Sequence, residues 1–202
     1  KHYFDYTKDV EDADVIIVNT CGFIEAAKEE SIDTIIEMAQ YKEVGNCKHL
    51  ILAGCLAQRY SDELIKEIPE VDAIMGTGNI KDLNTILNNL NSNSKISQVD
   101  NVDNDYLEGV KRDVKSPYAY IRISEGCDNL CTYCIIPQLR GKHRSRKIED
   151  IIKEANDLVE NGVREIIVIA QNTSDYGIDL YGEYSLYKLL DEMSKIEELY
   201  LI

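Results

Sequence analysis

The sequence of 202 residues contains no tryptophan, only two phenylalanines and three prolines, and no long hydrophobic run. Its longest apolar stretches, residues 15–18 and 166–170, have the length of strands and fall far short of the roughly 20 residues that a membrane-spanning helix needs. These absences exclude insertion into a membrane. Because 44% of the residues are hydrophobic, the chain can still bury a core, and we expect a soluble globular protein of one large or two modest domains.

Basic residues are also scarce, with 22 Lys and Arg against 37 Asp and Glu, which gives a formal net charge of -15. Binding to nucleic acid depends on cations that neutralise phosphates, so this balance excludes broad phosphate-driven binding. A local contact stays open at one basic segment, and a solvated loop that balances an acidic protein is the equally open alternative. The basic residues of this segment are Arg140, Lys142, His143, Arg144, Arg146 and Lys147.

Cysteines number only six, which is too few in a chain of this length for the dense disulfide scaffold of small secreted domains. Reduced thiols with metal or redox chemistry are the better interpretation, and they indicate the cytoplasm. The sequence begins with Lys1 rather than Met and stops at Ile202 within an apolar stretch, so we expect a fragment of a longer protein.

Apolar runs alternate with helical periodicity in the first part of the chain, which predicts a β-α-β-α-β order with a parallel sheet. The expected strands are short, rich in Val, Ile and Leu, and bounded by Gly, Asn or Asp, as is typical of buried parallel strands. The first helix places Ile24, Ala27, Ile32, Ile35 and Ile36 near one face. We expect strands at 13–19, 49–54 and 71–76 and helices at 23–38 and 80–90.

This order is lost at residues 92–116, which are polar and acidic with little to bury. We therefore expect a linker there, between a first domain of residues 1–91 and a second domain of residues 117–202. The β-α order resumes in the second domain, and a strand restarts near Leu199, so this domain should continue beyond its second β-α unit. We expect strands at 118–124 and 165–170 and helices at 148–161 and 186–193.

The strongest chemical signal is a C-x3-C-x2-C run, Cys127, Cys131 and Cys134, that directly follows a predicted strand. Thiolates are the usual ligands of 4Fe-4S clusters, which normally take four, so three in one loop leave one iron without a cysteine. A non-catalytic iron–sulfur electron carrier is one alternative. A structural zinc site with His143 as the fourth ligand is another, although zinc ligands commonly come as two closely spaced pairs.

A polar segment, residues 171–177, follows the next predicted strand. In a β/α barrel the reactive groups lie on the loops at the carboxyl ends of the strands. We therefore expect this segment to face the same mouth as the three cysteines and to hydrogen-bond a cofactor or substrate. An ordinary polar turn is the alternative.

Two further cysteines, Cys21 and Cys55, each follow a buried strand of the first domain. The carboxyl ends of parallel strands meet at one edge of a sheet, where ligands bind in open α/β folds, so these cysteines should lie near one crevice. Two unrelated core cysteines are the alternative, because free cysteine is often buried. Cys47 matches no pattern, and we assign it no role.

The cysteine loop resembles that of the radical S-adenosylmethionine (SAM) methylthiotransferase family. The resemblance rests on residues 125–137, Glu-Gly-Cys-Asp-Asn-Leu-Cys-Thr-Tyr-Cys-Ile-Ile-Pro, followed by Arg140-Gly141 and Ser145-Arg146. It extends to residues 19–31 and 54–60, which resemble the family's amino-terminal domain. It implies that the three cysteines hold a 4Fe-4S cluster whose open iron binds SAM, and that the second domain is the first part of a partial β/α (TIM-like) barrel.

Further roles are implied by the same resemblance. Tyr133 matches the family position near the adenine of SAM, with a plain core aromatic as the alternative, and Gln171 and Arg140 are candidates for contacts with SAM or substrate. In the family three cysteines hold a second 4Fe-4S cluster, and Cys21 and Cys55 match two of them. The third has no counterpart in this sequence, so we expect the chain alone to assemble that cluster poorly.

The flanking motifs at residues 21–24, 136–141 and 171–177 resemble the RimO type within this family. That type uses two SAM molecules to methylthiolate the β-carbon of an aspartate in a small-subunit ribosomal protein. A reductant of the flavodoxin or ferredoxin type is the other implied partner. Enzymes of the same family that modify adenosine 37 of transfer RNA are the closest alternative, and only they would have a nucleic acid as substrate.

Overall fold

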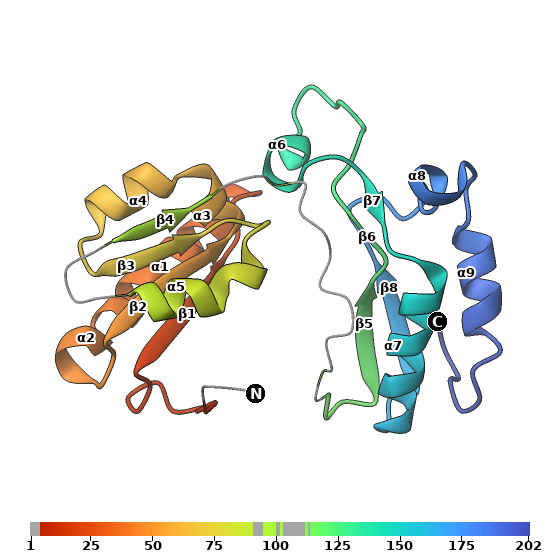
Figure 1. Cartoon of the computed structure of the whole chain (residues 1–202), viewed down its shortest axis with the longest axis horizontal. Helices are drawn as coiled ribbons and strands as arrows, with labels where there is room; N and C mark the ends of the chain where they lie inside the picture. The colour runs from red at the N-terminus through yellow and green to blue at the C-terminus, as the bar shows by residue number, and fades with distance from the viewer. Residues whose placement is uncertain (1–4, 91–94, 100–101, 103–111, 113) are drawn as a thin grey trace. The chain divides into compact units, whose positions relative to one another are not determined.

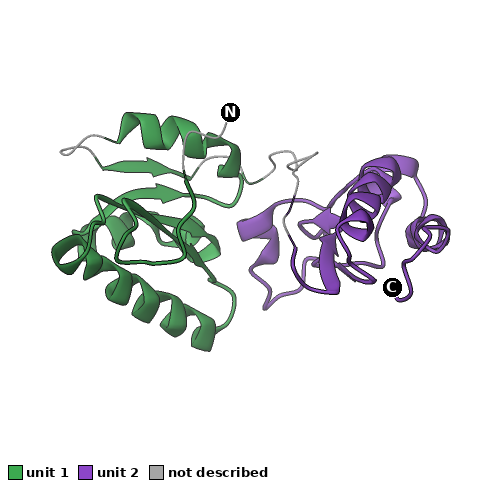
Figure 2. Ribbon diagram, turned by 90° about the horizontal axis from the view of Figure 1, so that it is seen from below, with its two compact units in different colours: residues 1–104 green, residues 105–202 purple. Residues whose placement is uncertain are grey.

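The computed structural model describes residues 5–90, 95–99, 102, 112 and 114–202, and the chain divides into two compact units (Figure 2). Unit 1 comprises Lys1–Asn104 and unit 2 comprises Asp105–Ile202. Most of the expected linker, 92–116, falls outside the described residues, but residues 96–98 form a strand of unit 1, so the sheet of this unit extends beyond the expected boundary at residue 91. None of the described helices is long and apolar enough to span a membrane.

Unit 1 contains a parallel sheet of four strands in the order β1-β2-β3-β4 (Figure 1). The α/β class and the first three strands agree with the sequence analysis. The fourth strand was not expected, because its three residues, Ile-Ser-Gln, include a single apolar side chain and carry almost no pattern. The strands are β1 (Val15–Thr20), β2 (His49–Gly54), β3 (Val71–Met75) and β4 (Ile96–Gln98).

Helices cover both faces of this sheet (Figure 1). Side chains of α1, α3 and α4 share one buried cluster with the sheet, whereas α5 contributes Ile86 to a second cluster on the other face. Burial on both faces explains why the strands are apolar runs rather than alternating patterns. The helices are α1 (Glu25–Ala39), α2 (Tyr41–Val44), α3 (Cys55–Arg59), α4 (Ser61–Glu67), the 3-10 helix η1 (Ile80–Asp82) and α5 (Leu83–Asn89).

The prediction that one apolar face of the first helix is buried was wrong in part. Ile35 is fully buried, but Ile24, Ile32 and Ile36 are 55%, 39% and 51% exposed. The reason is that α1 buries only a narrow stripe, Ser31, Ile35 and Ala39, at four-residue spacing, and neighbouring positions turn away from the sheet.

Unit 2 is built on two parallel strands, β5 and β8, that pair from Tyr118 with Glu165 to Arg122 with Ile169. The helices α7 and α9 lie on one face of this pair and bury Ile121, Ile166 and their neighbours (Figure 1). An isolated parallel bridge joins Glu165 to Leu201, near the point where the sequence predicts a further strand. The elements are β5 (Tyr118–Arg122), α7 (Ile148–Glu160), β8 (Glu165–Ile169), α8 (Ile178–Tyr181) and α9 (Leu186–Met193).

The strand expected at 118–124 breaks after Arg122. Beyond it the chain forms a short antiparallel hairpin, β6 (Ser124–Glu125) with β7 (Arg144–Ser145), and the intervening segment contains α6 (Ile136–Arg140). Pattern analysis could not reveal this hairpin, because each strand has only two residues.

Candidate functional site

The three-cysteine loop, residues 126–143, is enclosed by the hairpin, in which Ser124 pairs with Ser145 and Glu125 with Arg144. Gly126 opens the loop with a φ of +72°. A Cβ on this residue would lie 2.6 Å from the carbonyl oxygen of Gly141 and closer still to that of Lys142. Only glycine lets the two ends of the loop approach so closely.

The three cysteines differ in accessibility along this loop. Cys127 is buried, Cys134 is half-buried and Cys131 is exposed. The backbone N–H of Cys127 donates to Gly141 O at 3.2 Å, and that of Cys134 donates to Cys131 O at 3.0 Å. Cys127 therefore lies at the base of the loop and Cys131 near its tip.

The donor set suits an iron–sulfur cluster. All six cysteines lie within the described residues, and none is in a disulfide. In the described part of the chain, no three His, Cys, Asp or Glu side chains already converge as a metal site. Thiols of one loop, backed by the amide of Asn129, whose Nδ2 lies 3.5 Å from Cys127 Sγ, are nevertheless the ligand type that such clusters use.

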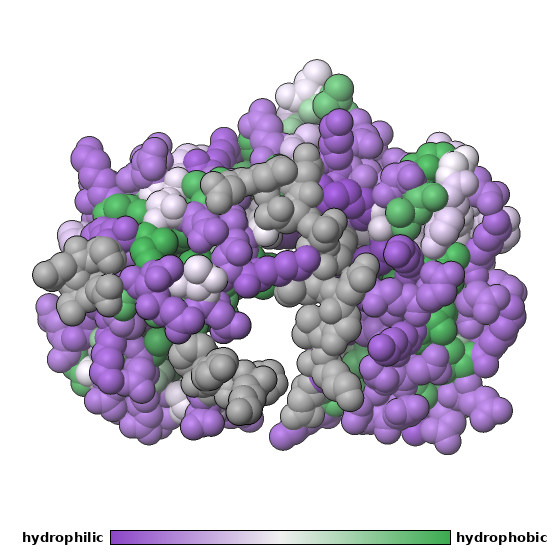
Figure 3. Space-filling model, in the orientation of Figure 1, coloured by the Kyte–Doolittle hydropathy of each residue, from purple (hydrophilic) through white to green (hydrophobic). Residues whose placement is uncertain are grey.

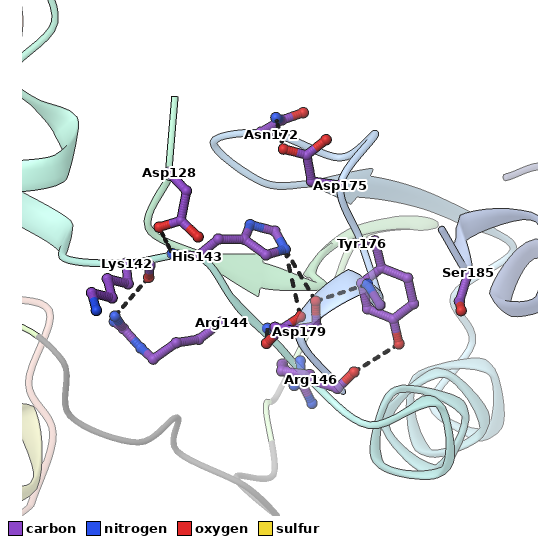
Figure 4. A network of polar contacts seen from close by, with 12 residues as sticks. Asp128, Lys142, His143, Arg144, Arg146, Asn172, Asp175, Tyr176, Asp179 and Ser185 are labelled. Atoms are coloured by element: carbon purple, nitrogen blue, oxygen red, sulfur yellow. Dashed lines mark hydrogen bonds and ion pairs between the residues drawn. The ribbon is translucent and has the colours of Figure 1, made fainter. Parts of the chain in front are cut away.

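A polar network holds the base of the loop against the segment that follows β8 (Figure 4). The backbone N–H of His143 donates to Asp128 Oδ1 at 3.0 Å, so the residue after Cys127 is fixed to the returning chain. The backbone N–H of Ser145 donates to Asp179 Oδ2 at 2.8 Å, and Ser145 Oγ accepts from the N–H of Gly177 at 2.9 Å. The loops at two neighbouring strand ends are thereby joined.

His143 belongs to this network. Its side chain is 2% exposed, and its Nε2 lies 3.1 Å from Ser145 Oγ and 3.8 Å from Asp179 Oδ1. Among the described residues, its Nδ1 has no hydrogen-bond partner. The Nε2 atom is thus engaged with Ser145 and with Asp179, and Nδ1 is the ring nitrogen left for a ligand.

The expectation that the whole polar segment faces the mouth was wrong for one residue. Tyr176 is fully buried, and its hydroxyl donates to Arg146 O at 2.7 Å. Burial raises the pKa of this phenol, which keeps it a donor. Of its neighbours, Asn172 donates to Asp175 at 2.7 Å, and Gln171 Oε1 is buried without a partner among the described residues.

The arginines of the basic segment make ion pairs and hydrogen bonds within unit 2. Arg146 binds Asp150 through Nε and Nη2, and its Nη1 lies 2.7 Å from Glu154 Oε2. Burial opposes its charge, but these carboxylates outweigh burial and raise its pKa. Arg144 donates to two backbone carbonyls.

Arg140, a predicted site residue, shares the carboxylate of Glu125 with Arg122. Its Nη1 is 3.2 Å from Glu125 Oε2, and the same oxygen accepts from Arg122 Nη1 at 2.7 Å. Glu125 is buried and lies two residues before Cys127. Neither Glu125 nor Arg122 was singled out from the sequence, although their closeness to the cysteines was a usable signal.

Tyr133 lies near the tip of the loop and is 90% exposed, as is Leu130 at 86%. The space-filling view shows an apolar spot at this tip on an otherwise largely hydrophilic face (Figure 3). In the chain as described, Tyr133 belongs to neither buried core.

Cys21 and Cys55 come together at the carboxyl edge of the unit 1 sheet. They directly follow the paired residues Thr20 and Gly54. A Cβ on Gly22 would lie 2.9 Å from the carbonyl carbon of Cys55, so the residue after Cys21 runs close to the backbone of Cys55. Cys55 is buried at the first turn of α3, and Cys21 is half-buried.

Two hydroxyl groups that the sequence analysis missed hold this edge. Thr20 Oγ1 donates to Ala53 O at 2.7 Å and accepts from the N–H of Ala57 at 3.1 Å. Ser31 Oγ accepts from the N–H of Cys21 at 3.0 Å. Thr20 directly precedes Cys21 and Ser31 lies ten positions after it, but a lone Thr or Ser carries no pattern that separates this role from others.

Cys47 lies near the amino end of β2, whereas Cys21 and Cys55 lie at the carboxyl edge of the same sheet. Burial raises the pKa of its thiol, only partly opposed by Lys42, so the protonated form is favoured. Its surroundings give it no ligand role.

Comparison with known protein families gives two matches. Residues 1–76 match the model described as Uncharacterized protein family UPF0004, and residues 121–201 match the Radical SAM superfamily. The second match includes all three cysteines of the loop. Radical SAM proteins use SAM and a 4Fe-4S cluster, so the resemblance seen in the sequence is confirmed at this level.

Individual relatives cover nearly all of the chain. A protein of Clostridioides difficile named ribosomal protein uS12 methylthiotransferase RimO is 57% identical over 191 residues, which are 94% of this chain and 43% of that protein. Proteins with the same name from Desulforamulus reducens and Clostridium perfringens are 53% and 51% identical over 97% and 96% of this chain. The chain spans less than half of the length of these relatives.

Proposed function

We propose, because this chain belongs to the radical SAM methylthiotransferase family, that the full-length protein methylthiolates the β-carbon of an aspartate in ribosomal protein uS12. The observation that carries this proposal is the three-cysteine loop, enclosed by its own hairpin at the end of the first strand of unit 2. The identity of 57% to a protein with this name supports the choice of substrate within the family.

Cys127, Cys131 and Cys134 are the proposed ligands of the cluster that binds SAM. When bound, this cluster supplies one electron that breaks a carbon–sulfur bond of SAM homolytically. The protein's own part is to fix the loop: Gly126 permits the close return of the chain, and Asp128 holds the base of the loop to His143. These contacts fix the ends of the loop that carries the three thiols.

A radical route suits the proposed substrate. The β-carbon of an aspartate side chain carries no acidic proton, so a general base cannot activate it, whereas abstraction of a hydrogen atom can. Exclusion of water from the site then protects the reactive species. The buried base of the loop, with Cys127 and Glu125 both about 9% exposed, provides part of such an environment.

Cys21 and Cys55 are the proposed ligands of a second 4Fe-4S cluster, which presents the sulfur that is transferred, with a second SAM as methyl donor. Their adjacent positions at one sheet edge support this assignment. We further propose that Tyr133 covers the adenine of bound SAM and that Gln171 and Arg140 contact SAM or substrate. The buried, unpaired Gln171 Oε1 supports a partner for this residue.

The decisive test uses the full-length protein, reconstituted anaerobically with iron and sulfide and given a flavodoxin- or ferredoxin-type reductant. Release of 5'-deoxyadenosine from SAM and methylthiolation of uS12 are the expected results. A loaded cluster that leaves SAM intact would contradict the enzyme and favour an electron carrier. Zinc without iron would favour a structural metal site, and modification of transfer RNA instead of uS12 would favour the alternative type.

A further inference from the structure

One arginine beside the cysteine loop has no role in the sequence motifs. Arg122 is the last residue of β5, on the face of the sheet opposite to α7 and α9. Along β5 the side chains of Ala119 and Ile121 enter the buried cluster, whereas those of Tyr118, Tyr120 and Arg122 are exposed. This exposed face ends, at its carboxyl edge, where the cysteine loop begins.

The guanidinium of Arg122 is only partly occupied. Its Nη1 donates to Glu125 Oε2 at 2.7 Å, and its side chain is 43% exposed. Within the described residues, no partner pairs with its Nε and Nη2, which together form the edge that binds a carboxylate with two parallel hydrogen bonds. A complete carboxylate-binding edge is therefore available at this position.

Arg146, which lies nearby, shows the opposite situation. Its Nε and Nη2 both bind Asp150, its Nη1 lies near Glu154 and also donates to Arg122 O at 2.9 Å, and its side chain is 8% exposed. Arg146 thus holds the end of β5 and the start of α7 together. The comparison separates an arginine with a structural role from one that can still bind a ligand.

The local charge also favours an anion at Arg122. Two guanidinium groups, those of Arg122 and Arg140, share the single carboxylate of Glu125. Arg122 therefore shares its carboxylate partner with a second cation, beside a loop of thiols that become negative when they bind metal. A carboxylate brought next to such thiolates is repelled unless a cation accompanies it.

We propose that Arg122 binds the side-chain carboxylate of the substrate aspartate through its Nε and Nη2. This inference rests on the proposed function and adds to it the group that recognises the substrate. The paired edge fixes the plane of the carboxylate and so the direction of the adjacent β-carbon. It also distinguishes aspartate from asparagine, whose amide nitrogen meets the guanidinium with a donor instead of an acceptor.

The test compares Arg122→Gln and Arg122→Lys with Arg164→Gln in the full-length protein carrying its clusters. Arg164 is the matched control, because it is a half-buried arginine of unit 2 whose Nη2 is paired with Glu198 at the other end of the sheet. The substrates are two uS12 peptides, one with the target aspartate and one with asparagine there. Peptide dissociation constants, kcat/KM and the SAM dissociation constant are measured, with iron content and circular dichroism as checks on folding.

We expect Arg122→Gln to lower kcat/KM for the aspartate peptide about 100-fold and to weaken its binding, because one partner of a charged pair is lost. Arg122→Lys keeps the charge without the paired edge, so its kcat/KM should be about 10-fold higher than that of Arg122→Gln. Discrimination between the two peptides should nearly vanish in Arg122→Gln, whereas SAM binding and the Arg164→Gln control should be unchanged.

Weaker SAM binding in Arg122→Gln, with discrimination between the peptides retained, would assign Arg122 to the carboxylate of SAM and overturn the proposal. Unchanged constants for both ligands would overturn it as well. Failure of the wild-type protein to modify the aspartate peptide would instead overturn the proposed function, so the two failures are distinguishable.

Discussion

The two cysteine sites of this chain differ in how completely the fold shapes them. Cys21 and Cys55 follow adjacent strands of a four-stranded sheet, and Gly22, the neighbour of Cys21, lies close to the backbone of Cys55. The other three cysteines lie on a loop whose base is fixed but whose tip, with Cys131 and Leu130, is exposed. The comparison teaches that pairing between strands fixes the positions of two thiols at a sheet edge. A loop with a fixed base fixes only the thiol nearest that base and leaves the thiol at its tip exposed.

Removing one ligand from each site gives the largest expected effects and separates their roles. Cys131→Ala should abolish SAM cleavage, by about 1000-fold or more, and should lower the iron content of the full-length protein from about eight to about four atoms. Cys55→Ala should keep SAM cleavage and lose methylthiolation. Iron analysis and 5'-deoxyadenosine quantification check both, and SAM cleavage that survives in Cys131→Ala would refute the assignment.

Glycine substitutions test the backbone of each site. Gly126→Ala should destabilise unit 2 by about 3 kcal/mol, because a positive φ and a collision with Gly141 and Lys142 add together. Gly54→Ala should do the same in unit 1, where a Cβ would lie 2.5 Å from Thr20 O. Urea unfolding measures the change.

Gly162→Ala is the matched control for these substitutions. Gly162 also has a positive φ, +97°, but nothing lies within 4 Å of a Cβ built there. Its cost should be about 1 kcal/mol, from backbone strain alone. Equal costs at all three positions would show that crowding of the backbone plays no part.

Removing side chains that hydrogen-bond to the backbone of the cysteine sites should have intermediate effects on stability. Asp128→Ala removes the acceptor of the His143 N–H, and Ser31→Ala removes that of the Cys21 N–H. Each should cost about 1–2 kcal/mol, and hydrogen exchange of the corresponding amide should accelerate about 10-fold. Asp128→Asn keeps an acceptor, so the His143 amide should exchange nearly as slowly as in the wild type. Equally fast exchange in Asp128→Ala and Asp128→Asn would contradict the role of this hydrogen bond.

The smallest effect is expected at Cys47. Cys47→Ala should leave iron content and SAM cleavage unchanged. Because burial raises the pKa of the Cys47 thiol, less of it is thiolate near neutral pH, so alkylation by iodoacetamide should be slower than at the exposed Cys131 in the metal-free protein. The alkylation rate at Cys47 should keep rising as the pH is raised above neutrality, as peptide mass spectrometry can follow.

Long apolar patterns made most of the fold predictable from the sequence. Strands such as β2 and helices such as α7 and α9 bury runs or stripes of Val, Ile and Leu, and these elements match their expected ranges closely. Short elements such as β4 and the hairpin of β6 and β7 were missed, because their stability comes from tertiary pairing rather than from their own two or three residues.

The candidate site shows the same division. The spacing of Cys127, Cys131 and Cys134 is a local signal, so the sequence alone reveals it. The partners of Glu125 and Asp128 come from residues about fifteen positions away, as the contacts to Arg140 and His143 show, and no single-sequence pattern reports such pairs. The expected outward position of Tyr176 failed for the same reason, since a polar tip on an aromatic ring is compatible with burial when a carbonyl accepts its proton.

The hairpin that closes the cysteine loop has a consequence for the order of assembly. Ser124 and Glu125 pair with Ser145 and Arg144, so contacts within the polypeptide join the ends of the loop, and Cys131 is exposed. The polypeptide can therefore fold before the inorganic centre arrives. Protein produced under iron starvation should accordingly be recoverable, gaining its centre later without passing through an unfolded state.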